Sequence, residues 1–349
     1  MTGDGGSAAV ERLHPAYFAM VMATGIVSVA AHLLGMPSLA LALFAVNAVA
    51  YPLLWVLTLL RLARYPRSVV RDLVDHQRGV GFFTAVAATG VLGVQCLVVL
   101  HRPGAATLLF ALAILLWALL TYAVFTAYTV KEDKPSLAEG INGGWLVAVV
   151  AAESIANLGG LLAASFRSGH DLLLFSCLVF WLFGGMLYIW ISSLIFYRYT
   201  FFRFLPSDLM PSYWINMGAA AIATLAGTTL IANASRSPVL SRMLPFLFGF
   251  TTLFWVTATW WIPLLVILTI WRHVIKRFEV AYDPLYWSAV FPLGMYAVAT
   301  LQLAQVLELP FLLVIPRVFV FVALIAWAAT FAGLLRSLAP GLWRTDATA

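Results

Sequence analysis

The segment SAVFPLGMYAVAT, residues 288–300, places Phe291, Pro292 and Gly294 close together in an otherwise apolar run. A proline removes one helical N–H bond and bends the helix, and a glycine lets the backbone pack closely or turn. At membrane depth such a break is tolerated where neighbouring groups or water take up the freed backbone groups. The segment therefore predicts a hinge in a membrane span, with the bulky Phe291 side chain directly on it.

The composition fits only an integral membrane protein. Of 349 residues, 63% are apolar and 10% are charged, and the mean hydropathy is +0.97. Soluble domains have about 25% charged residues. The two cysteines, Cys96 and Cys177, lie in apolar runs and indicate no disulfide framework. The net charge of +6 is read as a signal for membrane orientation, so the lipid bilayer is the expected partner and nucleic acid is not.

Apolar segments predict an all-α membrane protein, because strands of a membrane barrel are about 10 residues long and alternate in polarity. We expect one transmembrane domain over residues 15–338, between an N-terminal tail, 1–14, and a C-terminal tail, 339–349. The ten predicted spans are 15–35, 39–61, 80–100, 105–127, 143–164, 171–196, 212–233, 244–271, 284–306 and 312–335.

The distribution of basic residues predicts the orientation. The loops on the side of the N-terminus carry 15 Lys and Arg residues, and the opposite loops carry 5. Because basic loops stay in the cytoplasm, both termini are expected there, in a protein of the inner membrane.

A repeat runs through the odd-numbered spans. Each opens with an aromatic residue or pair, and these openings lie 62 to 73 residues apart. Placed in register, they align five small residues: Gly25, Gly90, Ala152, Ala221 and Gly294. This period predicts five tandem helical hairpins that all point the same way, around a central pore. The even spans would face lipid. The alternative is that the small residues only allow close helix packing. The predicted pore-lining residues are Thr24, Gly25, Thr89, Gly90, Ala152, Asn216 and Ala221.

Three segments carry a resemblance to a known family: HPAYFAMVMATGIVSVA (14–30), DHQRGVGFFTAVAATGVLG (75–93) and YWSAVFPLGMYAVATLQLA (286–304). The chain resembles the tellurite-resistance/dicarboxylate transporter family, which includes slow anion channels, malic acid transporters and sulfite efflux pumps. The resemblance implies five hairpins around a pore, commonly in a homotrimer. It also implies that Phe291 plugs the pore. Pro292 and Gly294, which form the predicted hinge, complete the expected gate. The alternative is that Phe291 is a core residue beside a structural kink.

Glu153 is the one carboxylate in the middle of a predicted span. An ionised carboxylate at the bilayer centre costs on the order of 2.5–3.5 kcal/mol by insertion scales. Two interpretations stay open. Glu153 faces the permeation path and couples anion movement to protons, or it lies between helices and is satisfied by polar groups such as Asn157 or Asn216.

The expected function is transmembrane transport of small anions. No Lys or Arg lies at mid-depth in a span, so binding in the pore should be weak, which suits conduction. Four-carbon dicarboxylates such as malate are the first expected substrates. The alternative is a passive channel or efflux pump for sulfite, tellurite, chloride or nitrate. No catalytic residue, metal site or cofactor is predicted. A different-class alternative is an intramembrane prenyl-transfer enzyme that uses Asp72 and Asp75, whose D-x-x-D spacing is also that of a salt-bridged loop.

Overall fold

The computed structural model describes residues 9–166 and 169–342, with side chains described up to 338. Ten helices in this part are long and apolar enough to cross a membrane, which confirms the predicted number of spans. The two predicted tails lie partly outside the described residues. Arg167 and Arg344, which belong to the count of basic residues in the loops, lie wholly outside them. The last helix continues to Leu342, past the predicted domain end at 338, because a helix does not have to stop where its apolar run ends.

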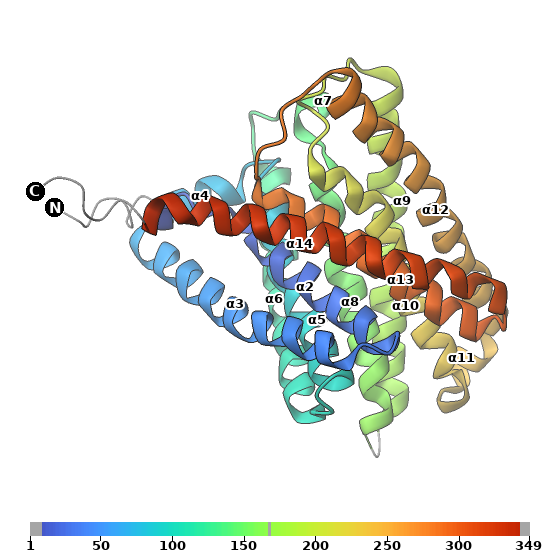
Figure 1. Cartoon of the computed structure of the whole chain (residues 1–349). Coiled ribbons are helices and arrows are strands. Elements are labelled where there is room, and N and C mark those ends of the chain that lie inside the picture. Colours follow the sequence, from blue (N-terminus) through green and yellow to red (C-terminus); the bar gives the residue numbers. More distant parts are fainter. Residues whose placement is uncertain (1–8, 167–168, 343–349) are drawn as a thin grey trace, which may run out of the picture.

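The odd-numbered spans form an inner layer and the even-numbered spans an outer one (Figure 1). The most apolar window of each odd span is 72–94% buried, whereas that of each even span is 17–44% buried. The inner helices are α2 (Ala19–Leu33), α5 (Phe83–Val98), α8 (Val147–Leu162), α10 (Ile215–Ala232) and α13 (Trp287–Val306). The outer helices are α3 (Pro37–Arg64), α6 (Pro103–Val130), α9 (His170–Phe201), α12 (Leu244–Ile270) and α14 (Val314–Leu342).

The inner helices contact one another in cyclic order. Helix α2 packs on α5, α5 on α8, α8 on α10, α10 on α13, and α13 again on α2. Each inner helix also packs against the outer helix that follows it in the chain. The predicted hairpin arrangement is therefore compatible with the packing, with five inner helices around a common axis.

Every inner helix opens with a 3-10 turn: Pro15–Phe18, Gly79–Phe82, Gly143–Leu146, Pro211–Trp214 and Pro284–Tyr286. The first residue of each turn is proline or glycine. Proline suits this position because its fixed φ is helical and its missing N–H would have no partner there. Aligning the five inner helices on the first residue of each turn gives a repeat register that depends on backbone geometry. An alignment on the aromatic pairs differs from this register by one residue in α5 and in α8.

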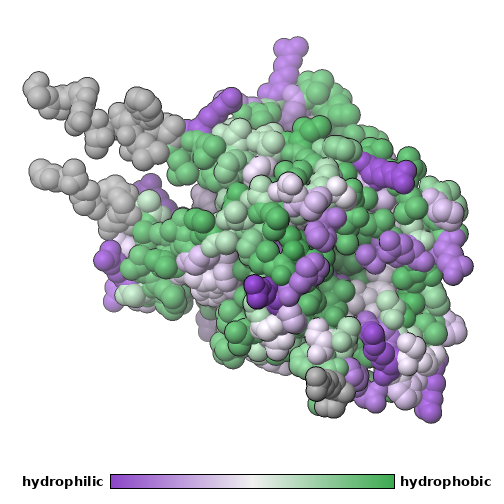
Figure 2. All heavy atoms as spheres, turned by 60° about the horizontal axis from the view of Figure 1, so that its bottom comes forward, coloured by the Kyte–Doolittle hydropathy of each residue, from purple (hydrophilic) through white to green (hydrophobic). Residues whose placement is uncertain are grey.

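Several hydroxyl groups on the outer helices are satisfied within their own helix. Hydroxyls such as Thr58, Thr129 and Thr257 donate to the carbonyl four residues earlier, at 2.7–2.8 Å. In lipid an unsatisfied polar group costs several kcal/mol, so these bonds allow Thr at exposed positions of a membrane-spanning helix. Figure 2 shows the resulting surface, which is largely hydrophobic with scattered groups of hydrophilic residues.

Three short helices lie in the connections between the spans: α4 (Pro66–Leu73), α7 (Leu137–Gly140) and α11 (Pro238–Arg242). The described chain ends close to α4, on the side where the inner helices begin (Figure 1).

Candidate functional site

Two cavities lie on the axis of the five inner helices. We call the one where these helices begin the inner cavity, and the one nearer their C-terminal ends the outer cavity. The outer cavity, of about 170 Å³, is lined from all five, and the 3-10 register places one lining residue of each helix at the same level. These residues are Ile26, Gly90, Ser154, Ile222 and Met295. Asn157, Thr229 and Gln302 add polar groups, and no ionisable side chain of the described chain lines this cavity.

The inner cavity, of about 210 Å³, lies where the five helices begin. Its lining comes from the 3-10 turns, the residues just before them and the first helical turns. Unlike the outer cavity, it has two ionisable side chains in its lining, His14 and Arg78. The inner cavity therefore differs from the outer one in charge as well as in position.

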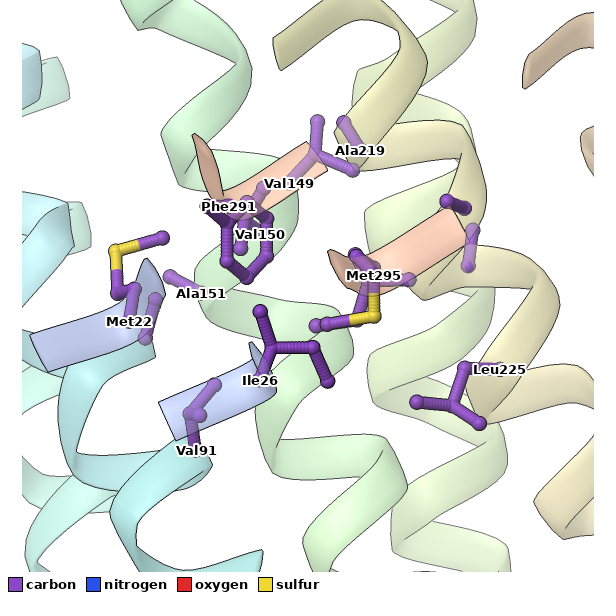
Figure 3. Packing of buried hydrophobic residues seen from close by; sticks show 14 of the residues in the cluster. Met22, Ile26, Val91, Val149, Val150, Ala151, Ala219, Leu225, Phe291 and Met295 are labelled. Atoms are coloured by element: carbon purple, nitrogen blue, oxygen red, sulfur yellow. The ribbon is translucent and has the colours of Figure 1, made fainter. Parts of the chain in front are cut away.

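A buried apolar layer separates the two cavities. In α13, Ser288 lines the inner cavity and Met295 the outer one, and Phe291 lies between them at helical spacing. The Phe291 side chain is 1% exposed. Figure 3 shows its ring beside Val150, with Met22 and Ala219 nearby and Ile26 and Met295 toward the outer cavity. One turn before the outer-cavity level, the register gives Met22, Val86, Val150, Gly218 and Phe291, so Phe291 is the only aromatic residue in this layer.

Helix α13 continues through Pro292 from Trp287 to Val306. The proline removes the bond to the carbonyl of Ser288, and this residue lines the inner cavity, where water can reach it. A Cβ on Gly218 of α10 would lie 2.7 Å from Pro292 Cγ. A Cβ on Gly294 would lie 3.1 Å from Ile26 and Val27 of α2. Pro292 and Gly294 thus hold α13 close to its two neighbours in the ring, α10 and α2.

Of the predicted pore-lining residues, Gly90 lines the outer cavity and the other six line neither cavity. Thr24 accepts a hydrogen bond from Trp327 of α14, and Thr89 is bonded to Tyr51 of α3. A Cβ on Gly25 would meet Val91 and Asn47. These three positions therefore face neighbouring helices, since small residues allow helices to pack closely.

The remaining predicted residues are buried between helices. Ala152 and Ala221 are fully buried. Asn216 donates through Nδ2 to the Tyr213 carbonyl, and its own carbonyl accepts from Tyr188 of α9.

The carboxyl group of Glu153 lies between α8 and α9, away from both cavities. The residue is fully buried, and a Cβ on Gly184 of α9 would collide with its Oε1. Neither carboxyl oxygen has a hydrogen-bond partner in the described chain. Asn157, an expected partner of Glu153, instead accepts a hydrogen bond from the Thr229 hydroxyl at 2.8 Å. The next residue, Ser154, lines the outer cavity in its place.

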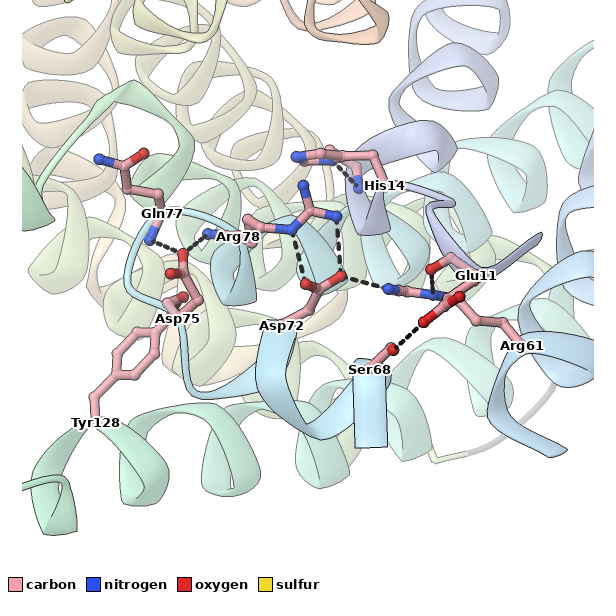
Figure 4. Close-up of polar contacts among 10 residues, drawn as sticks. Glu11, His14, Arg61, Ser68, Asp72, Asp75, Gln77, Arg78 and Tyr128 are labelled. Atoms are coloured by element: carbon pink, nitrogen blue, oxygen red, sulfur yellow. Dashed lines mark hydrogen bonds and ion pairs between the residues drawn. The ribbon is translucent and has the colours of Figure 1, made fainter. Parts of the chain in front are cut away.

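The two aspartates of the D-x-x-D motif are occupied by other contacts (Figure 4). Asp72 binds Arg61 at 2.7 Å and Arg78 at 2.8 and 3.0 Å. Burial acts to raise the pKa of Asp72, but the hydrogen bonds and charges of Arg78 and Arg61 outweigh it and lower the pKa below its usual value. Asp75 accepts from the backbone N–H groups of Gln77 and Arg78. No group of metal-ligating residues occurs in the described part of the chain.

His14 precedes the first inner helix and lines the inner cavity. Its Nδ1 accepts from the backbone N–H of Ala16 at 3.1 Å. Burial, together with the charge of Arg78, lowers the pKa of His14 from 6.5 to about 4. His14 is therefore a neutral side chain at neutral pH, with its proton on Nε2.

Sequence reasoning missed the inner cavity. Its polar residues Arg78, Asn142 and Ser212 lie before or inside the 3-10 turns, and the aromatic repeat register begins one to four residues after them. A proline or glycine ahead of each aromatic residue, at this spacing, was the signal that would have located them.

The chain is similar in sequence to several known membrane proteins and transporters. An uncharacterized membrane protein of Mycobacterium tuberculosis is 38% identical over 161 residues, which is 46% of this chain and 80% of that protein. An uncharacterized transporter of Methanocaldococcus jannaschii is 25% identical over 301 residues, 83% of this chain and 84% of that protein. A sulfite efflux pump of Arthroderma benhamiae is 24% identical over 345 residues, 93% of this chain and 90% of that protein.

The family model described as voltage-dependent anion channel, SLAC1, matches residues 12–335. Proteins of this kind are channels and transporters, so the chain is not an enzyme and the prenyl-transfer alternative is wrong. The match reaches into all ten spans, and the chain belongs to the voltage-dependent anion channel family of membrane proteins.

Proposed function

We propose that anions cross the membrane along the axis of the five inner helices and that Phe291 closes this path. The observation that carries the proposal is the position of Phe291 between two cavities on one axis. A dry apolar layer stops ions because they would lose their hydration there, and hydrophobic constrictions gate pores in this way. Displacement of one aromatic ring would join the two cavities.

The first substrate class that we propose is small inorganic oxyanions such as sulfite, ahead of malate. A relative that is named a sulfite efflux pump aligns with nearly the whole chain. The outer cavity offers amide and hydroxyl groups and no cation to a passing anion. A four-carbon dicarboxylate carries two separated charges that such a site cannot pair. Malate, tellurite, chloride and nitrate are the other anions to compare.

Flux through the reconstituted protein tests the gate. Phe291→Ala should raise sulfite flux about tenfold or more, because a barrier lowered by about 1.4 kcal/mol gives a tenfold faster step. Phe254→Ala is the matched control, because Phe254 is also buried but lies on the outer helix α12. If the two variants raise flux equally, or if Phe291→Ala leaves flux unchanged in a folded protein, Phe291 is not the gate.

We propose passive conduction rather than proton coupling. Glu153 stays the only predicted coupling residue, and its carboxyl group against Gly184 lies off both cavities. Glu153→Gln should therefore leave the pH profile of flux unchanged. A flattened profile in this variant would instead assign proton coupling to Glu153.

We further propose that both termini are cytoplasmic, in the inner membrane, and that the protein is a homotrimer. Ten spans and the excess of basic residues on the side of the N-terminus support the orientation. Protease access to terminal tags in sealed vesicles and the mass of the purified particle test the two statements separately.

A further inference from the structure

Two side chains of the inner cavity hold unused hydrogen-bonding groups. Asn142 Nδ2 and Ser212 Oγ have no partner in the described chain, although the residues are only 4% and 3% exposed. Both residues line the inner cavity. Asn142 Oδ1 accepts from the backbone N–H of Gly144 at 2.7 Å, so the amide group that remains free is the donor. Buried groups of this kind are costly unless something binds them.

A third free donor belongs to Arg78. Its Nε and Nη2 bind Asp72, and its Nη1 makes no hydrogen bond in the described chain. Asp72 is shared with Arg61, so one carboxylate faces two guanidinium groups. The cluster of Arg61, Asp72 and Arg78 therefore keeps one positive charge, and the bidentate pair holds Arg78 in place at the cavity wall.

The backbone adds to this field. Arg78 and Asn142 each directly precede a 3-10 turn, and Ser212 is the second residue of another. The N-terminal ends of all five inner helices surround the cavity, and each carries a partial positive charge. The exposed Asp283 opposes this field, because it directly precedes the fifth turn, where it accepts from the N–H of Leu285.

We propose that the inner cavity is a binding site for a small oxyanion, held by Arg78 Nη1, Asn142 Nδ2 and Ser212 Oγ. Three donors and a net positive cluster suit a compact anion with several acceptor oxygens. A cation would instead meet the net positive charge of the Arg61, Asp72 and Arg78 cluster. The site rests on the proposed function in that its ligand is the transported anion, which it would hold on the inner side of Phe291.

Equilibrium binding of radiolabelled sulfite to the purified full-length protein tests this site. Arg78→Gln should weaken binding tenfold or more, since it removes a charged donor. Ser212→Ala should weaken it several-fold with little risk to the fold. Asp283→Asn should strengthen binding, because it removes the opposing charge. Ser237→Ala is the matched control, because Ser237 is also buried without a partner but lies outside the inner cavity, and it should bind like the wild type.

The proposal is overturned if the wild type does not bind sulfite, or if Arg78→Gln and Ser212→Ala both bind with the wild-type Kd. Flux through the wild type, measured separately, distinguishes this failure from failure of the proposed function. Flux with unaltered binding in the variants would remove the site and keep the function. Weakened binding in the variants without any wild-type flux would keep the site and remove the function.

Discussion

The middle layer around Phe291 and the inner cavity are built from the same five helices, one turn apart, but they are held together by different interactions. The middle layer depends on steric fit, with Pro292 against Gly218 and Gly294 against Ile26 and Val27. The inner cavity depends on charge, with Asp72 between Arg61 and Arg78. The difference indicates that a barrier to ions requires dry close packing, whereas an entrance for them requires fixed donors.

Overpacking the middle layer should have the largest effect. In Gly218→Leu, the new Cβ would lie 2.7 Å from the rigid Pro292 ring, so α10 and α13 cannot keep their distance. Strain of this kind costs about 1–3 kcal/mol or more, and little folded protein should remain. The measurement is the yield and thermal midpoint of monodisperse protein.

The matched control is Gly249→Leu, because a Cβ there meets nothing within 4 Å. It should behave like the wild type. Equal loss in both variants would mean that leucine is harmful in either helix for reasons unrelated to the contact with Pro292.

Removing the charge of Asp72 should have the next largest effect. Asp72→Asn leaves two arginines without their carboxylate, and breaking a buried pair costs about 3 kcal/mol. The folded-state pKa of Asp72 lies below its unfolded value of 3.8. Its stabilisation is therefore present above pH 3.8 and lost as pH falls through the lower, folded-state pKa.

The thermal midpoint of Asp72→Asn should accordingly lie below that of the wild type at neutral pH, and the difference should shrink in acid. A difference that stays constant well below pH 3.8, in protein that is still folded there, would exclude ionic pairing as its cause.

The fold was predictable because its signals repeat along the chain. Ten apolar runs gave the spans, and five small residues in register indicated that the odd spans pack together. Most of the residues predicted to line the pore, however, line neither cavity. Thr24, Gly25 and Thr89 are small because other helices contact them, and the lining residues Ile26, Ile222 and Met295 are larger. Side-chain size identifies packing faces, whereas a cavity depends on where neighbouring helices end.

Position along the axis was easier to predict than direction around it. Phe291 lies between the levels of Ser288 and Met295, because the helix rise fixes the position of a residue along the axis. The direction of Glu153 was left open, and Glu153 proves to be the residue directly before the cavity-lining Ser154. A shift of one residue turns a helical side chain by about 100°, and the aromatic pairs used for alignment are displaced by that amount in α5 and α8.

The most direct test of the central claim is access to single cysteines from each side of the membrane. In a background without Cys96 and Cys177, Ser288→Cys should react with an impermeant thiol reagent from the side of the termini alone. Met295→Cys should react from the opposite side alone. Adding Phe291→Ala should make both cysteines reactive from both sides. Reaction of either cysteine from both sides while Phe291 is present, in a folded protein, would contradict a barrier at this residue.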